Sequence, residues 1–288
     1  MSAVPPSAQA PAWNRALSAK TLGVLAVLFL GIALVRHRDS FRLGRREAAM
    51  LIVFGLVGLA GEQWAVTEAI ARLDVGIVIL CVYSGPFLIA LWCRLVRKEP
   101  MPTAVWIAIA TGLFGLALAV GLIGGEVGVL SVSGLVLAVL AGCIFAYYAL
   151  HATTLLAARP APIVLGLAAL VALVAWTAFA APPRDFPVDA LADSVHLAGM
   201  TMPAWVLMLV SVVLGTAVPY LMTLAGISRI GPTPTTVAGM IEPVLAVLLS
   251  WAWLGQSLSL LQGVGAVAVL AAVVVVQRAR RGTTVVAV

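Results

Sequence analysis

The chain has 288 residues, of which 63% are hydrophobic and only 10% are Asp, Glu, Lys or Arg, and its mean hydropathy is +1.14. A soluble domain carries about 45–50% apolar and about 25% charged residues. So few charges cannot cover a soluble globule of this size, which excludes a cytosolic enzyme, a nucleic-acid-binding domain and a disordered regulator. The net charge of +6 does not indicate a nucleic-acid partner, because the basic residues gather between apolar runs.

Nine apolar runs are predicted to form membrane-spanning helices, which need about 20 mostly apolar residues each. In chain order they cover 21–35, 48–69, 75–96, 103–123, 133–156, 162–180, 203–225, 233–254 and 260–277. We therefore expect an all-α polytopic membrane protein that contacts the lipid bilayer. Residues 1–20 contain three Pro and are expected to be a disordered tail, not a secretory signal. Residues 278–288 are expected to form a cytoplasmic tail.

The basic residues indicate an orientation. Of the 17 Lys and Arg residues, 13 fall in alternate connections that share one side of the membrane, and such an excess marks the cytoplasmic side. With nine spans this places the C-terminus inside the cell and the N-terminus outside. The long connection 181–202, which carries three Asp residues, then faces outward.

An internal repeat appears when the sequence is shifted by 157 residues. The shift aligns Gly58 with Gly215, Arg72 with Arg229, and Pro86 with Pro243. Each copy shows an apolar helix, a turn with Arg, a helix centred on Pro, and a third apolar helix. An odd number of spans separates the copies, so they insert in opposite directions, which is typical of secondary transporters. The second copy has one more leading helix than the first, so a four-plus-five bundle is expected, with repeats over 21–124 and 131–277.

Several motifs resemble the EamA-type branch of the drug/metabolite transporter superfamily. They are GTAVPY at 215–220, SRIG at 228–231, IEPVLA at 241–246, LGQSLS at 254–259 and GVGA at 263–266, with YSGP at 83–86 similar to the threonine/homoserine exporter type. The resemblance covers 21–277. It implies ten helices with both ends cytoplasmic and export of small metabolites by alternating access, in the plasma (inner) membrane of a bacterium.

Three departures from the family pattern stand out. The first helix is absent, so only nine spans of the ten-helix pattern are visible. Gln256 stands where the family has an acid, and Val82 stands where many exporters of this branch have another acid. These departures bear on coupling and substrate class.

One group of candidate site residues surrounds the two matched prolines. Glu242 lies roughly 12 Å into the 233–254 helix at 1.5 Å per residue, and a carboxylate at that depth usually faces a cavity or a partner. Pro243 follows it and leaves the carbonyl of Gly239 without its helical donor. Ser84 and Pro86 interrupt the matching helix of the first copy, and paired interruptions of this kind indicate a transporter's binding site. The alternatives are a protonated packing acid and two kinks that only shape the bundle.

A second group lies outside the proline motifs. Glu62, Gln63 and Trp64 fall in the outer half of the 48–69 helix, where Glu62 is a candidate proton carrier or amine contact. Tyr83 and Tyr220 could form an aromatic wall for an aliphatic or ammonium group. Interhelical hydrogen bonding for Glu62, and packing or interface roles for the tyrosines, remain the alternatives.

The expected function is a transporter for small molecules, most plausibly an amino-acid exporter driven by a gradient, with protons as one candidate coupling ion. Efflux of lipophilic cations is the alternative within the same class, and a non-transporting membrane scaffold is the alternative from another class. No Walker or HExxH motif and no catalytic Ser/His/Asp set occurs in the sequence, and its three Cys show no metal-ligand spacing. We therefore expect no enzyme activity, no metal and no cofactor.

Overall fold

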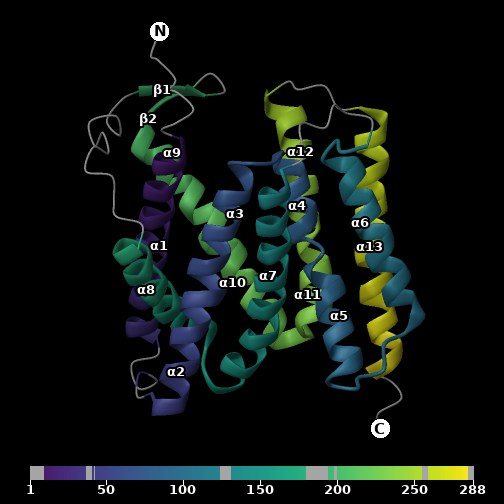
Figure 1. Cartoon of the computed structure of the whole chain (residues 1–288), viewed down its shortest axis with the longest axis horizontal. Helices are drawn as coiled ribbons and strands as arrows, with labels where there is room; N and C mark the ends of the chain where they lie inside the picture. The colour runs from purple at the N-terminus through teal and green to yellow at the C-terminus, as the bar shows by residue number, and fades with distance from the viewer. Residues whose placement is uncertain are drawn as a thin grey trace. The chain divides into compact units, whose positions relative to one another are not determined.

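The computed structural model describes residues 10–36, 41, 43–123, 131–179, 194–197, 200–254 and 259–284. Within these residues the chain forms nine helical rods and one β-hairpin (Figure 1). The rods are α1 (Ala10–Arg36), α2–η2–α3 (Arg45–Val53, Phe54–Gly61, Glu62–Ile70), α4–α5 (Val75–Val82, Gly85–Leu95), α6 (Thr103–Ala119), α7 (Val132–Ala158), α8 (Ala161–Phe179), α9–η4–α10 (Ala204–Val212, Val213–Ala217, Val218–Ile230), α11–α12 (Pro232–Gly239, Ile241–Leu254) and α13 (Leu260–Thr284).

Most of the rods are apolar, and several have the length of a membrane span. Five of them are long and apolar enough to cross a bilayer among the described residues: 45–70, 75–95, 132–158, 161–178 and 204–230. Three shorter apolar helices cover 21–36, 103–119 and 260–276. The predicted all-α polytopic membrane fold is therefore confirmed.

The structure differs from the expected boundaries at two places. Helix α1 begins at Ala10, so the expectation of a disordered tail is wrong from that residue onward, while residues 1–9 lie outside the described part. The connection expected at 181–202 contains β1 (Ser194–Leu197) and most of β2 (Met200–Pro203), an antiparallel hairpin that the sequence patterns did not predict. Its three Asp residues, like Gln256, also lie outside the described part.

The chain forms two compact units, each built from both repeats. Unit 1 contains residues 1–71 and 151–228, and unit 2 contains residues 72–150 and 229–288. The second segment of unit 2 begins 157 residues after the first, at Arg229 and Arg72 respectively, so the units divide both copies at the same repeat position. Each unit therefore pairs corresponding helices of the two copies.

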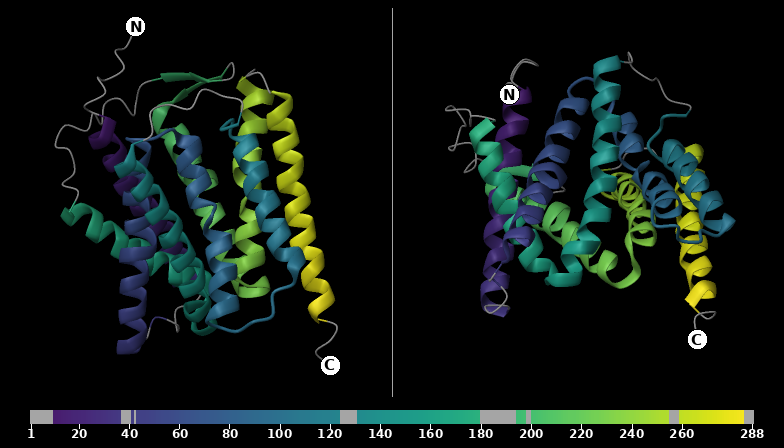
Figure 2. Two further views of the ribbon diagram at one scale, coloured as in Figure 1. Left: turned by 45° about the vertical axis from the view of Figure 1, so that its right-hand side comes forward. Right: turned by 60° about the horizontal axis from the view of Figure 1, so that its bottom comes forward.

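In unit 2 the matched helices α6 and α13 lie side by side in opposite directions (Figures 1 and 2). A Cβ on Gly112 would lie 3.3 Å from Cβ of Ala272, and a Cβ on Gly115 would lie 3.0 Å from the backbone nitrogen of Val269. The 157-residue shift aligns Gly112 with Val269 and Gly115 with Ala272. The repeat equivalent of the contact between positions 112 and 272 is therefore the contact between positions 269 and 115. This correspondence is the signature of a local two-fold relation between inverted copies.

Unit 1 shows the same antiparallel pairing between α1 and α8. The position of Gly23 meets the side chain of Leu173, whereas Gly166, earlier in α8, meets the backbone nitrogen of Leu30, later in α1. Leu25, Phe29 and other apolar side chains of α1 are buried on this side. Close approach at small residues is the usual way in which helices associate within a bilayer.

A π-helical segment also recurs in the two copies. Segment η2 covers Phe54–Gly61 and contains Gly58, and segment η4 covers Val213–Ala217 and contains Gly215. These glycines are partners in the 157-residue repeat. π-Helical turns are rare and often occur at functional sites, so their recurrence indicates that the two copies share a local distortion as well as a helix order.

Candidate functional site

The first-copy proline interrupts a helix of unit 2. Helix α4 ends at Val82, Tyr83 and Ser84 form a turn, and α5 begins at Gly85. Since Pro86 has no N–H, it cannot donate to the carbonyl four residues earlier. The Ser84 hydroxyl donates to the carbonyl of Cys81 at 2.7 Å, which adds a local bond at the break.

The second-copy proline interrupts the matching helix of the same unit. Helix α11 ends at Gly239, Met240 forms a turn, and α12 begins at Ile241, two residues before Pro243. Pro243 leaves the carbonyl of Gly239 without its i+4 donor, just as Pro86 leaves the carbonyl of Val82 without its donor in the first copy. Both copies therefore break where the repeat predicts.

The two interruptions meet through Tyr83 and Glu242. The phenolic hydroxyl of Tyr83 donates a hydrogen bond to Oε2 of Glu242 at 3.0 Å. The Cε1 atom of Tyr83 would lie 3.9 Å from a Cβ on Gly239, so the ring also lies against the residue whose carbonyl lost its donor. Three of the predicted site residues, one from the first copy and two from the second, thus form one cluster.

The buried side of this cluster is apolar. Met240 is fully buried with Val244 and Leu116, and Tyr83 packs against them. Pro86 and Pro243 are also buried. The Glu242 side chain, by contrast, is exposed. The Glu242 side chain therefore has buried apolar residues beside it and remains accessible on its other side.

The repeat equivalents of Glu242 and its neighbours are covered by another helix. The equivalent of Glu242 is Gly85, and a Cβ there would lie 2.5 Å from the Phe145 ring of α7. Ile89 is fully buried, whereas its equivalent Ala246 is exposed. Helix α7 is the additional leading helix of the second copy, for which no counterpart was found in the first. Its position explains why the face with Gly85 is closed while the face with Glu242 is open.

The other predicted residues belong to unit 1. Glu62, Gln63 and Trp64 begin α3 directly after η2; the first two are half-buried and Trp64 is 46% exposed. Tyr220 is half-buried in α10, three residues after η4 ends. Gln63 and Tyr220 are repeat equivalents, so both copies place a polar side chain just beyond the π-helical segment. These four residues belong to unit 1, and the Tyr83–Glu242 cluster belongs to unit 2.

Metal ligation is not a feature of the described part of the chain. Among those residues, no group of three His, Cys, Asp or Glu side chains is arranged to hold a metal ion. What the Tyr83–Glu242 cluster offers is a carboxylate, a phenol and a backbone carbonyl, which together suit a cation, an ammonium group or a proton.

Comparison with known families decides the identity of the fold. The model of the EamA-like transporter family matches residues 15–121 and 132–278. The chain belongs to this family. The predicted resemblance to EamA-type transporters is therefore confirmed, and the protein is a multi-pass membrane transporter.

Individual relatives of this EamA-like chain agree with that assignment. It is 26% identical over 270 residues to a Salmonella typhimurium protein described as the uncharacterized inner membrane transporter YicL, which covers 90% of the chain and 85% of that relative. A solved structure titled only as the crystal structure of a protein superimposes with a TM-score of 0.73 at 19% identity, covering 95% of this chain and 89% of the other. At that identity the solved structure shows the fold alone.

Some features of this EamA-like transporter were missed by the sequence interpretation. Phe145 was not a candidate, although it packs against Tyr83 with ring centroids 6.3 Å apart. Gly142, one turn earlier in α7, lies directly against the Cys81 carbonyl. The spacing of small residues along α7 was the available signal, since small side chains mark close helix contacts in membranes.

A second missed feature is an ion pair in unit 1 of this EamA-like chain. Arg159, between α7 and α8, donates from Nη2 to Oε2 of Glu47 at 2.9 Å and from Nε to Oε1. These hydrogen bonds raise the pKa of Arg159 above its ordinary value. A two-point contact of this kind fixes both planar groups, so the pair ties the start of α2 to the α7–α8 connection.

Proposed function

We propose that the chain exports small amine-bearing metabolites, with amino acids as the leading substrate class, by alternating access driven by an ion gradient. The observation that carries this proposal is the hydrogen bond from Tyr83 to Glu242 at the interruptions of two inverted-repeat helices. Discontinuous helices form substrate and ion sites in many secondary transporters, because their unpaired backbone groups supply ligands.

In this proposal Glu242 binds the substrate ammonium group or a proton, but not both at once. The ionised carboxylate attracts an ammonium group, while the Gly239 carbonyl, freed by Pro243, offers an additional acceptor. Protonation of Glu242 removes the charge and releases the amine. Such competition links the movement of substrate to the movement of protons in the opposite direction.

Glu62 is the second candidate for the coupling group. It is the other acid that lies well inside a predicted span, and it follows the π-helical segment η2. Gln63, Trp64 and Tyr220 are proposed to contribute substrate contacts in unit 1. We further propose that the protein resides in a bacterial inner membrane with its C-terminus in the cytoplasm, because alternate connections on that side carry most of the Lys and Arg residues.

Efflux of lipophilic cations is a second candidate function. The tilted ring pair of Tyr83 and Phe145 beside Glu242 supports it, because aromatic faces and a carboxylate both attract organic cations. An amino-acid site should also provide a positive group or a helix N-terminus for the substrate carboxylate. The two functions therefore differ in whether a zwitterion or a simple cation is moved.

Retention assays test both functions. Cells with and without the protein are loaded with labelled amino acids or with ethidium, and loss of each compound is followed at several external pH values. We expect protein-dependent loss of amino acids, and loss of pH dependence in Glu242→Gln but not in Glu99→Gln, whose carboxylate lies exposed in the α5–α6 connection. Protein-dependent loss of ethidium alone selects the cation function. If the pH dependence of transport persists in Glu242→Gln and disappears in Glu62→Gln, the coupling role belongs to Glu62.

A further inference from the structure

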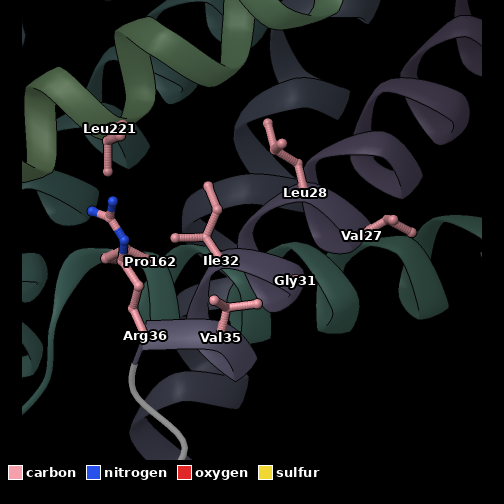
Figure 3. Close-up of a pocket in the computed structure, with 8 residues that line it drawn as sticks. All are labelled: Val27, Leu28, Gly31, Ile32, Val35, Arg36, Pro162 and Leu221. Carbon is pink, nitrogen blue, oxygen red and sulfur yellow. The ribbon is translucent and has the colours of Figure 1, made fainter.

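An apolar groove lies in unit 1, whereas the Tyr83–Glu242 cluster belongs to unit 2. It has a volume of about 700 Å³ and is lined by six residues of α1 together with one residue each of α8 and α10 (Figure 3): Val27, Leu28, Gly31, Ile32, Val35, Arg36, Pro162 and Leu221. Seven of these eight residues are apolar or glycine, and Arg36 is the charged one.

The groove follows a second apolar stripe on α1. The first stripe, which includes Leu25 and Phe29, is buried in the unit. Val27, Gly31 and Val35 are spaced four residues apart, so they share another face of the helix. Val27 and Val35 are 77% and 83% exposed, and a Cβ on Gly31 would meet nothing within 4 Å. The chain therefore leaves open a long apolar surface at membrane depth.

Arg36 makes the two ends of the groove different, because it places a positive charge at one end. It is the last residue of α1, and its guanidinium extends past Pro162 toward Leu221 at one end of the groove (Figure 3). Because the apolar part of α1 ends at this residue, we expect the guanidinium to lie at the boundary between hydrocarbon and headgroups. Arg45 and Arg46 begin the next rod, α2, and so enter the membrane from the same side.

We propose that this groove binds an anionic phospholipid, with one acyl chain along Val27, Gly31 and Val35 and the phosphate paired with Arg36. An acyl chain matches the apolar lining, and basic pockets between transmembrane helices bind anionic headgroups. A guanidinium holds a phosphate through paired hydrogen bonds. A neighbouring apolar helix is the poorer occupant, because it would bury the Arg36 charge against hydrocarbon.

Native mass spectrometry of the purified full-length protein tests this proposal. Dioleoyl phosphatidylglycerol and dioleoyl phosphatidylcholine are titrated separately in detergent, and inorganic phosphate forms a third arm. We expect one phosphatidylglycerol to bind about fivefold more tightly than phosphatidylcholine, which is the advantage of about one basic side chain near a lipid headgroup. Inorganic phosphate alone should not displace the bound lipid.

Three variants separate the headgroup contact from the chain contact. Arg36→Gln should make the affinities for the two lipids equal. Arg94→Gln, which removes an exposed Arg from the last turn of α5, should keep the wild-type preference for phosphatidylglycerol. Gly31→Phe, which places a ring in the open groove, should weaken the binding of both lipids to the same extent. Thermal unfolding without added lipid checks that each variant is folded.

Four results overturn the proposal. Equal binding of the two lipids by the wild-type protein removes the role of the anionic headgroup. Equal effects of Arg36→Gln and Arg94→Gln reduce the preference to general surface charge. Displacement of phosphatidylglycerol by millimolar phosphate shows that the headgroup alone accounts for binding. Wild-type lipid binding by folded Gly31→Phe shows that no acyl chain occupies the groove.

Discussion

The hydroxyl of Tyr83 and the carboxylate of Glu242 are joined by a hydrogen bond of 3.0 Å, although 159 residues separate them in the chain. Tyr83 stands at the break between α4 and α5, and Glu242 stands at the start of α12 just after the matching break. The bond therefore fastens a helix of the first copy to its inverted counterpart where neither helix is continuous. A contact at that point is well placed to respond when a substrate or a proton reaches the carboxylate.

Removing the phenolic hydroxyl in Tyr83→Phe should weaken transport while the aromatic packing remains. A hydrogen bond of this kind contributes about 1 kcal/mol net, or about a fivefold change in an equilibrium constant. We expect the KM for substrate to rise by about that factor in Tyr83→Phe. Initial rates of substrate loss from loaded vesicles at several concentrations provide the measurement. An unchanged KM in a folded variant would show that Tyr83 does not orient the Glu242 carboxylate for binding.

The closed face at Gly85 should not tolerate a side chain there. A Cβ there would lie 2.5 Å from the Phe145 ring, so Gly85→Ala must displace that ring and, with it, the contact of the ring with Tyr83. Overpacking costs about 1–3 kcal/mol, and we expect a lower Tm in detergent. Adding Phe145→Leu to Gly85→Ala should recover part of the loss, because the smaller side chain leaves room. A double variant no more stable than Gly85→Ala would contradict this explanation.

The helical framework could be predicted because membrane spans carry their signal in composition. The repeat of Pro86 with Pro243 also anticipated both interruptions, since proline removes a helical donor wherever it stands. The contact of Tyr83 with Glu242 could not be derived, because the alignment pairs Tyr83 with Met240 and says nothing about which side chains face each other. The burial of Gly85 under Phe145 depended on the position of α7, which no local pattern encodes.

The π-helical segments and the Glu47–Arg159 ion pair were missed for related reasons. A π-helical turn inserts one residue into a helix without changing its apolar composition, so Gly58 and Gly215 were visible only as repeat partners. The ion pair joins Glu47 and Arg159, 112 residues apart in the chain, and the number of basic residues on each side of the membrane does not indicate which charged residues pair.

Close packing of α6 against α13 should depend on Gly115. A Cβ at this position would lie 2.7 Å from Cβ of Ala268 and 2.8 Å from the Gly265 carbonyl oxygen. Backbone atoms cannot move aside as a flexible side chain can, so Gly115→Ala should force the helices apart at a cost of about 3 kcal/mol. Thermal unfolding in detergent is the measurement. The control is Gly263→Ala in α13, where a Cβ meets nothing within 4 Å; similar losses in both variants would exclude packing as the cause.

The ion pair of Glu47 with Arg159 should stabilise unit 1. Both side chains are mostly buried, with 16% and 18% of their surfaces exposed, and Glu47 also lies in the first turn of α2, where a negative charge is favoured by the helix dipole. Removing the carboxylate charge in Glu47→Gln leaves Arg159 with a neutral partner, so we expect a lower Tm. The control is Arg97→Gln, which removes the more exposed and more distant pair of Arg97 with Glu99 at 3.9 Å and should leave Tm unchanged.

Reversal of the charges separates the pairing from the helix dipole. In Glu47→Arg combined with Arg159→Glu the pair can form again, but the first turn of α2 then carries a third positive charge beside Arg45 and Arg46. We therefore expect the double variant to be more stable than Glu47→Arg alone and less stable than the wild-type protein. The coupling follows from Tm values of the two single variants, the double variant and the wild type. Strictly additive effects would mean that the contact contributes nothing beyond the two separate side chains.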